Sequence, residues 1–442
     1  MVFPITVLHA FNYQRTEKNG APYRFTHGIP NSRKTERYNS IFEKRGLAMT
    51  SRSWLPLIGI TLCVFIFNMS EFMPIGLLTD ISKDFGISES RAGLIISVYA
   101  WAVAIISLPI MLALRKMQYR RMLLMAVFMF AAFQIMSGIS SSYWMLMISR
   151  LGVAIAHSIF WSIAAPLAVR VVSPDYEKLA LSTVAAGTSI AMIIGLPLGR
   201  IIGLALGWRM SFITIAIVSI IVLVLLVAVF PKVENPGTFT VKRLPDIFRN
   251  KVLMGIYVVV AVFVTGYYAG YSYIEPFLAQ TGGLSENMIT VALTVFGLAG
   301  IGGSMLFTKC YDRTRFRFMV FALGGASICL LLLNLASSSV WTVMIVCMVW
   351  GVCSISFNVS TQNEAINASP DDAVPVAMSI FSGIYNVGIA MGSIIGGIVT
   401  DNGSVSDIGY VGAVFTICAT LFLAFYVIKQ IKKRELTADS SH

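Results

Sequence analysis

The stretch FIFNMSEFMPIGLL, residues 65–78, is apolar at almost every position and yet contains a carboxylate, Glu71. A charged side chain at the centre of a membrane-spanning helix costs about 3 kcal/mol on insertion scales. Such residues usually face a partner or a water-filled cavity, and they often mark the path of a substrate or a proton. The surroundings of Glu71 therefore decide both the fold and the function of this chain.

The composition is that of a polytopic membrane protein. Of the 442 residues, 57% are hydrophobic and 12% are charged, whereas soluble domains carry about 25% charged residues. The net charge of +12 comes largely from basic residues in short loops between apolar spans, which argues against nucleic-acid binding. The six cysteines show no CxxC spacing and one histidine, His157, lies in an apolar span, so no disulfide framework, metal or other cofactor is expected.

Twelve apolar segments are long enough, at about 20 residues each, to cross a bilayer. We expect all of them to be helices, because a spanning segment must satisfy its own backbone hydrogen bonds. The predicted spans are residues 54–79, 92–114, 122–139, 144–168, 179–202, 210–230, 253–278, 287–308, 318–336, 341–364, 375–399 and 409–429. Basic residues gather in alternate loops, and the opposite loops carry only Lys83, Arg91 and Arg209, which predicts that both termini are cytoplasmic.

Residues 1–52 form a polar, basic extension before the first span. Its opening, MVFPITVLHAF, is too short to span a membrane and lacks the basic amino-terminal region of a signal peptide, so it is a poor signal peptide. Met49 resembles an ordinary start site just before the first span. The first 48 residues are therefore either a cytoplasmic extension of the native protein or an artefact of start-site choice.

The chain repeats itself at a spacing of close to 200 residues. GISE at 86–89 returns as GLSE at 283–286, SSSYW at 140–144 returns as SSSVW at 337–341, and IAM at 190–192 returns at 389–391. Parallel repeats of six helices imply two halves related by an axis along the membrane normal, as in transporters. The expected organisation is an extension (1–52), a six-helix half (53–230), a cytoplasmic connector (231–252), a second six-helix half (253–430) and a tail (431–442).

The fourth span carries Arg150, His157 and Trp161 on one helical face, at i, i+7 and i+11. A cation, an imidazole and an indole N–H on one face suit a wet cavity that holds a polar ligand. The alternative is a structural arginine beside a core histidine.

The first span places Asn68 and Glu71 on one face, and Pro74 weakens the helix that follows. A carboxyl group in a region of low dielectric constant favours its neutral form, so Glu71 can take up a proton on one side of the membrane and release it on the other. The alternatives for Glu71 are a fixed ion pair and a hydrogen bond between helices.

The remaining candidates are ionisable, aromatic and amide side chains within the other spans. Tyr268 and Tyr271 either stack on and bind a sugar or belong to an aromatic belt at the membrane interface. Arg200, Glu275 and Glu364 are further ionisable residues, and Glu275 is expected near the outer end, where it can be solvated. Uncharged polar groups suit a neutral, polyhydroxylated ligand, and the further candidates for its cavity are Tyr99, Trp101, Asn358, Gln362 and Asn386.

Several motifs resemble those of the major facilitator superfamily. Asp312-Arg313-Thr-Arg315 resembles its loop motif, which implies a gating role for these three charged residues. The matching loop at 114–121 keeps the basic residues but lacks the usual Asp and leading Gly. Arg150-Leu-Gly152 resembles the fourth-helix motif, whose arginine the family associates with proton coupling. The stretch 195–200 resembles the fifth-helix signature of antiporters.

The chain is most similar to sugar efflux transporters of the SotB type, in the drug/proton antiporter branch, over about residues 50–430. The more specific stretches are 149–162 in the fourth span and 271–276 in the seventh. The resemblance implies an all-α membrane protein of the major facilitator fold that exports a sugar, arabinose- or thiogalactoside-like, across the bacterial inner membrane. We also expect proton antiport, with Glu71 as the first candidate for the proton carrier and His157 as the second, and with Arg150 balancing the charge. The protein is expected to be a monomer.

Three alternatives remain from the sequence. The nearest is a drug or purine nucleoside exporter of the same fold. A membrane-embedded enzyme would need a nucleophile–base pair or a metal cluster, and the sequence offers neither, so no enzyme activity is expected. A non-transporting sensor would usually carry a sizeable soluble domain.

Overall fold

The computed structural model describes residues 51–114, 117–173, 176–233, 244–369 and 374–439, which are helices and their connections without a strand. Most of the expected extension 1–52, residues 234–243 of the connector and the end of the tail lie outside the described residues.

The helices run along one axis of the molecule and are joined by short connections. Their bounds are α3 Ser51–Phe72, η2 Met73–Leu77, α4 Leu78–Phe85, α5 Glu89–Leu114, α6 Tyr119–Gly138, α7 Tyr143–Arg170, α8 Glu177–Leu206, α9 Trp208–Val229, α10 Leu244–Arg249, α11 Lys251–Tyr271, α12 Ile274–Gln280, α13 Glu286–Ala336, α14 Val340–Ala368, α15 Val374–Asn402, η5 Val405–Asp407, α16 Ile408–Phe422, η6 Leu423–Val427 and α17 Ile428–Asp439.

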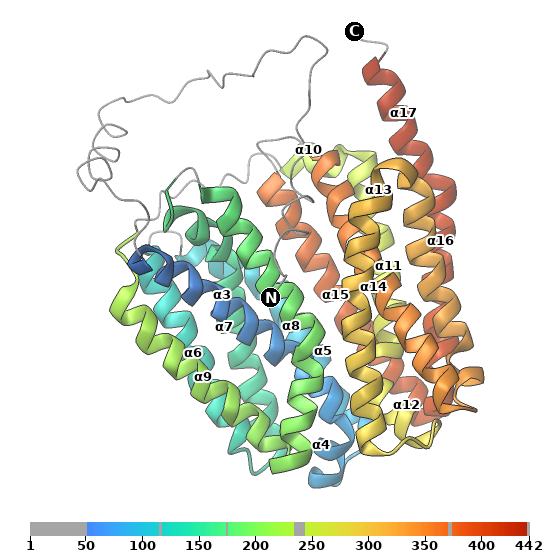
Figure 1. Ribbon diagram of the computed structural model, residues 1–442, viewed down its shortest axis with the longest axis horizontal. Coiled ribbons are helices and arrows are strands. Elements are labelled where there is room, and N and C mark those ends of the chain that lie inside the picture. Colours follow the sequence, from blue (N-terminus) through green and yellow to red (C-terminus); the bar gives the residue numbers. More distant parts are fainter. Residues whose placement is uncertain (1–50, 115–116, 174–175, 234–243, 370–373, 440–442) are drawn as a thin grey trace.

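The helices form two groups that stand side by side (Figure 1). In the first helix group, α3 to α9, α6 packs on α7 and α9 while α3 packs on α8. In the second helix group, α11 to α16, α13 packs on α14 and α11 packs on α15 and α16. The two groups touch mainly where α5 meets α15 and where α8 meets α13. We call the end of the bundle with α10 and α17 the connector end, and the end with α4 and α12 the far end.

The expected fold class is confirmed, and the twelve predicted spans are accounted for with one difference. Among the described residues, ten helices are long and apolar enough to cross a membrane, or eleven when the bent helix α8 counts as one span. One of these, α13, runs for 51 residues and covers two predicted spans, so the expected loop between them is helical. The chain turns at Thr314, whose φ of −131° and ψ of 26° lie outside the helical region.

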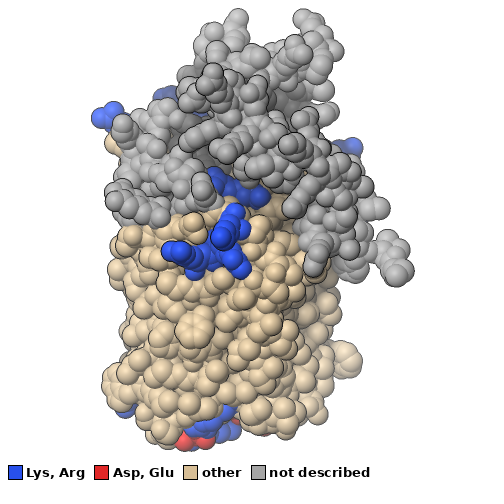
Figure 2. Space-filling model, turned by 90° about the vertical axis from the view of Figure 1, so that its left-hand side faces the viewer, with Lys and Arg blue, Asp and Glu red and all other residues tan. Residues whose placement is uncertain are grey.

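The outer surface between the two ends is apolar. Figure 2 shows Lys and Arg near the connector end, charged residues at the opposite edge, and a broad uncharged band between them. On α9 the exposed residues Ile217, Ile221 and Val224 recur at helical spacing. An exposed apolar band of this kind fits the hydrocarbon core of a bilayer.

Near the middle of α8, the two groups approach so closely that backbone meets backbone. A Cβ atom added at Gly297 of α13 would lie only 2.2 Å from the carbonyl oxygen of Ile193 in α8. At the far end, another small residue, Gly397 of α15, faces Ser90 of α5 and the hydroxyl of Tyr273. Within a membrane there is no hydrophobic driving force between helices, so their association depends on close packing, which small residues allow.

We expect Gly297→Ala to destabilise the contact between α8 and α13, because the backbone of α8 cannot move aside as a flexible side chain does. Overpacking of this kind costs about 1–3 kcal/mol, so the thermal unfolding midpoint of the purified protein should fall. The control is Gly302→Ala on the same helix, where the nearest atom lies 3.7 Å away. An equal loss in both variants would show that the close approach is not the cause.

Candidate functional site

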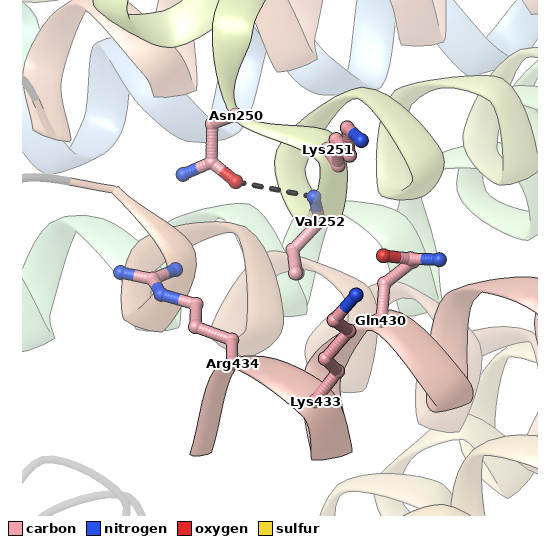
Figure 3. A pocket seen from close by; sticks show the side chains of 6 residues that line it. All are labelled: Asn250, Lys251, Val252, Gln430, Lys433 and Arg434. Atoms are coloured by element: carbon pink, nitrogen blue, oxygen red, sulfur yellow. Dashed lines mark hydrogen bonds between the residues drawn. The ribbon is translucent and has the colours of Figure 1, made fainter. Parts of the chain in front are cut away.

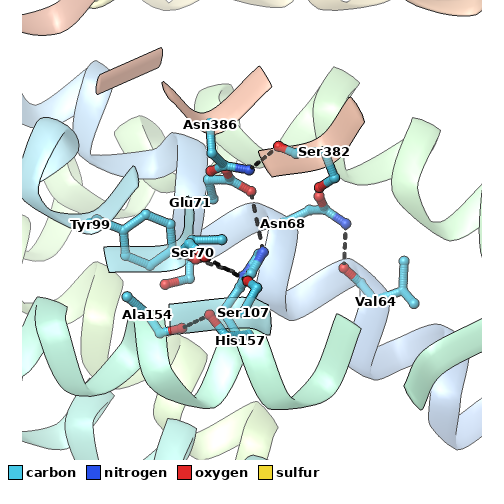
Figure 4. A network of polar contacts seen from close by, with 12 residues as sticks. Val64, Asn68, Ser70, Glu71, Tyr99, Ser107, Ala154, His157, Ser382 and Asn386 are labelled. Atoms are coloured by element: carbon cyan, nitrogen blue, oxygen red, sulfur yellow. Dashed lines mark hydrogen bonds and ion pairs between the residues drawn. The ribbon is translucent and has the colours of Figure 1, made fainter. Parts of the chain in front are cut away.

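Glu71 lies in the interior of the bundle beside His157. Its Oε2 atom is 3.9 Å from the Nε2 atom of His157, and the two side chains are 12% and 6% exposed. Figure 4 shows both residues in a polar network built from the first helix group and from α15. Glu71 is thus close to a titratable partner, and part of its own side chain remains exposed.

The imidazole of His157 is held in a fixed orientation. Its Nδ1 atom is 2.7 Å from the hydroxyl of Tyr99 on α5, and its ring packs against Phe67 and Trp161. The two ring nitrogens therefore face different groups, with Nδ1 toward Tyr99 and Nε2 toward Glu71. The prediction that His157 and Trp161 share a face is confirmed by this contact.

Arg150 is fully buried and is bound by uncharged groups. Its guanidinium donates hydrogen bonds of 3.1 Å to both the hydroxyl and the carbonyl oxygen of Ser70 and lies 4.6 Å from the ring centre of Tyr99. The Ser70 carbonyl is available because Pro74, four residues later, has no N–H to donate. The weak point expected at Pro74 is observed as the 3-10 turn η2, and it supplies the acceptor for Arg150.

The second helix group presents amide and hydroxyl groups. Gln362 donates a hydrogen bond of 2.6 Å to Asn358, and the rings of Tyr268 and Tyr385 lie edge-on with their centres 6.4 Å apart. Amide and hydroxyl groups predicted from separate spans therefore lie together within the second helix group.

Several other predicted cavity residues lie close to this network. Asn386 of α15 is buried and donates to the carbonyl of Ser382, one turn earlier. Asn68 in the same way donates to Val64 of its own helix. Figure 4 shows both amides at the edge of the network.

Two predicted residues have other surroundings. Tyr271 is buried among Tyr267, Phe296 and Trp350 inside the second helix group. The alternative of an interfacial belt is wrong for Tyr268 and Tyr271, because both are buried rather than exposed to lipid. Trp101 is half-buried against the apolar core.

A second buried charge site joins the two helix groups at the far end. Arg200 of α8 and Glu275 of α12 form an ion pair of 3.0 Å, with side chains only 2% and 3% exposed. The backbone N–H and the hydroxyl of Thr79 donate to the same carboxylate at 3.1 and 2.7 Å. Arg200 also donates to the carbonyl of Gly76 at 2.7 Å. We call Arg200, Glu275 and Thr79 the far-end latch.

The far-end latch corrects one expectation from the sequence. Glu275 lies toward that end of the bundle, as expected, but it is buried and paired instead of solvated. The sequence predicted Arg200 and Glu275 as separate ionisable residues within the membrane and did not predict that they form an ion pair. Their opposite charges at similar depths in different halves are the signal that could have suggested the pair.

Of the three charged residues in the predicted gating loop, Arg315 forms ion pairs with other helices. Arg315 binds Glu364 of α14 with contacts of 2.5 and 2.6 Å and binds Glu435 of α17 at 2.5 Å. Asp312 and Arg313 are exposed, and no ion pair involves either of them within the described part of the chain. The described residues also contain no cluster of three or more potential metal ligands.

The comparisons with known proteins agree with this architecture. The sequence matches the family model described as Major Facilitator Superfamily over residues 60–371 and 271–441. Among solved structures, it is similar to a bacterial homolog of the human lysosomal transporter Spinster in an inward-facing and unoccupied conformation, with 15% identity, a TM-score of 0.68, and coverage of 87% of this chain and 99% of that one. A mutant of the peptide transporter POT gives 13% identity, a TM-score of 0.70, and coverage of 85% and 94%.

We expect Glu275→Gln to loosen the far end, because it leaves the buried Arg200 without its counter-charge. Breaking a buried ion pair typically costs about 3–5 kcal/mol. The measurement is the thermal unfolding midpoint, together with labelling of a cysteine placed at Ser90 in a background that lacks the native cysteines. Relative to the wild type, the unfolding midpoint of Glu275→Gln should fall, and the cysteine at position 90 should be labelled faster.

The matched control is Asp84→Asn, which makes the same acid-to-amide change in an exposed ion pair. Arg209 pairs with Asp84 at 2.7 Å, but these side chains are 33% and 39% exposed, and an exposed pair contributes about 0–1 kcal/mol. If the two variants behaved alike, the far-end latch would not hold the helix groups together.

Proposed function

Because the chain belongs to the major facilitator superfamily, whose members are transporters and not enzymes, we propose that it exports a sugar in exchange for protons. The proposed substrate is arabinose- or thiogalactoside-like. The proposed location is the bacterial inner membrane, with both termini in the cytoplasm and the chain acting as a monomer.

The observation that carries this proposal is the placement of Glu71. A partly exposed carboxylate lies 3.9 Å from an imidazole, and Asn386 of the opposite helix group belongs to the same polar network (Figure 4). A carboxylate that is not locked into an ion pair can gain and lose a proton, whereas uncharged amides and hydroxyls can bind sugar hydroxyls. We propose that the ion and substrate sites are adjacent, as exchange requires.

Glu71 is a better proton carrier than His157 in this arrangement. Arg150 provides a fixed positive charge beside the network, and a second positive charge on a buried imidazole nearby would be repelled. Protonation of Glu71 instead neutralises a charge in a region of low dielectric constant. We therefore assign proton transfer to Glu71, and the alignment of the carboxylate to His157 and Tyr99.

The proposed cycle is alternating access between the two halves, residues 53–230 and 253–430. The far-end latch holds the far end closed, and the α8–α13 contact joins the two halves near the middle of α8. The Arg315 cluster ties α13 to α14 and α17 at the connector end. Opening of the far end would require Arg200 and Glu275 to separate and exchange their contact for water. Glu71 of α3 and Thr79 of α4 belong to one span, Trp54–Phe85, so movement of the far-end latch would be passed toward Glu71 through η2.

The alternative substrate is a drug or a purine nucleoside. The aromatic rings beside the network, Trp161, Tyr268 and Tyr385, favour this alternative because planar ligands stack on them. A counterflow assay on purified protein in liposomes distinguishes the candidates, with arabinose, a thiogalactoside, a dye and a purine nucleoside as test solutes. Exchange of the sugars alone supports the first proposal.

We expect Glu71→Gln to abolish sugar efflux driven by a pH gradient and to leave sugar counterflow largely intact, because the amide cannot carry a proton but keeps the shape of the carboxyl group. Both activities are measured in the same proteoliposomes with an imposed gradient. The control is Glu286→Gln, which removes an exposed carboxylate at the start of α13.

A Glu71→Gln protein that still responded to the gradient like the wild type would exclude Glu71 as the proton carrier. Loss of counterflow as well as gradient-driven efflux would instead place Glu71 in substrate binding.

A further inference from the structure

The two ends of the second helix group differ in the side chains that gather there. At the connector end, the start of α11 and one face of α17 border a cavity of about 230 Å³ (Figure 3). Its lining residues are Asn250, Lys251, Val252, Gln430, Lys433 and Arg434. At the far end, two carboxyl groups from different helix groups come together instead, because Glu275 of α12 and Glu89 of α5 contact the same side chain. Repulsion between two carboxylates at close range favours a proton on one of them.

The shared side chain is Thr79 of α4. Its Oγ1 atom lies 2.7 Å from the Oε2 atom of Glu275 and 3.0 Å from the Oε1 atom of Glu89. An ionised carboxylate can only accept hydrogen bonds, and a threonine hydroxyl has one proton to donate. One hydroxyl proton therefore cannot fully satisfy both contacts. A second proton, carried by one of the two acids, completes the chain of hydrogen bonds.

The surroundings of the two acids decide which of them carries that proton. Glu275 is buried, pairs with Arg200 at 3.0 Å and also accepts the backbone N–H of Thr79 at 3.1 Å, so it is held as an anion. Glu89 instead accepts from the neutral amide of Gln280 at 2.8 Å. A protonated Glu89 can donate to the Thr79 hydroxyl and still accept from Gln280. The second proton therefore belongs to Glu89.

The neighbouring charges do not provide Glu89 with a counter-ion, since no ion pair involves Glu89 within the described part of the chain. Asp84 pairs with Arg209 at 2.7 Å, and the guanidinium of Arg91 lies 5.9 Å from the ring centre of Tyr143. The titratable and charged residues on the elements around Glu89 are Asp80, Lys83, Asp84, Arg91, Tyr143, Arg200, Arg209, Tyr273, Glu275, Glu286, Asp401 and Asp407.

These contacts cross between the helix groups and lead inward from the surface. Glu89 and Thr79 belong to the first helix group, whereas Gln280 and Glu275 belong to the second. Gln280 is exposed, Glu89 is partly buried, and Thr79 and Glu275 are buried. Separation of the two groups at this end would break the contacts of Glu89 with Gln280 and of Thr79 with Glu275. Water would then reach Glu89 and could take up its proton.

We propose that the far end closes with a proton bound between Glu89 and the hydroxyl of Thr79 and releases this proton when it opens. The closed state holds one proton more than the open state, so a rise in pH favours opening and a fall in pH favours closure. For a single proton, the ratio of closed to open protein falls by at most about tenfold per pH unit. This switch goes beyond the proposed exchange at Glu71, because it concerns the far end alone and does not depend on the solute.

The test is the distance across the far end of the full chain, measured by pulsed electron paramagnetic resonance from about pH 5 to about pH 8. Ser141→Cys and Asn287→Cys carry the spin labels, in a protein without the native cysteines, because these exposed residues lie at the far end of different helix groups. In the otherwise unchanged protein, the longer distance should become more populated as the pH rises. Glu89→Gln should keep the shorter distance at every pH, because its amide donates to Thr79 permanently.

The matched control is Asp401→Asn, which neutralises an exposed carboxylate at the same end of the bundle and should keep the pH response. A distance that did not depend on pH would overturn the proposal, as would a pH response that survived in Glu89→Gln. Loss of the response in Asp401→Asn as well would identify a diffuse charge effect and overturn it too.

A second pair of variants tests the shared hydroxyl. Thr79→Val removes the hydroxyl group and should abolish the pH response, whereas Thr79→Ser keeps the hydroxyl group and should preserve it. A Thr79→Val protein with the same pH response as its parent would show that the hydroxyl does not hold the proton, and the proposal would then be wrong.

Discussion

The structure depends on how charge is accommodated in an apolar bundle. Glu275 is fully satisfied, since it has Arg200 and two donors from Thr79 and is hidden from solvent. Glu71 is not, since its closest ionisable partner lies at 3.9 Å and part of its side chain remains exposed. The first arrangement makes a buried contact between the helix groups. The second leaves a carboxylate without a close counter-charge, which is why the proposed proton carrier is Glu71 and not Glu275.

The fold was largely predictable because its signals are local. Apolar length identifies the spans, and the repeat of six helices predicts how they are grouped. The loop expected between residues 308 and 318 differs, because one non-helical residue, Thr314, lets α13 change direction without leaving the helix for long. Hydropathy cannot distinguish a turn of this kind from a loop, since both are polar and basic.

The candidate site was predictable in its membership but not in its contacts. Helical spacing placed Arg150, His157 and Trp161 on one face, and the structure keeps His157 and Trp161 together. The binding of Arg150 to the Ser70 carbonyl depends on a proline in another helix, which spacing within one helix does not reveal. The pairing of Arg200 with Glu275 likewise depends on how the two helix groups meet.

The contacts of α17 have a practical consequence for following the transport cycle. Glu435 is bound to Arg315, and Arg434 to the carbonyl of Ala368, so the carboxyl-terminal helix is anchored to the second helix group. A fluorophore attached near its end would move as a rigid extension of that group. Paired with a second dye on α6, it would report the rocking of one half against the other as a change in energy transfer.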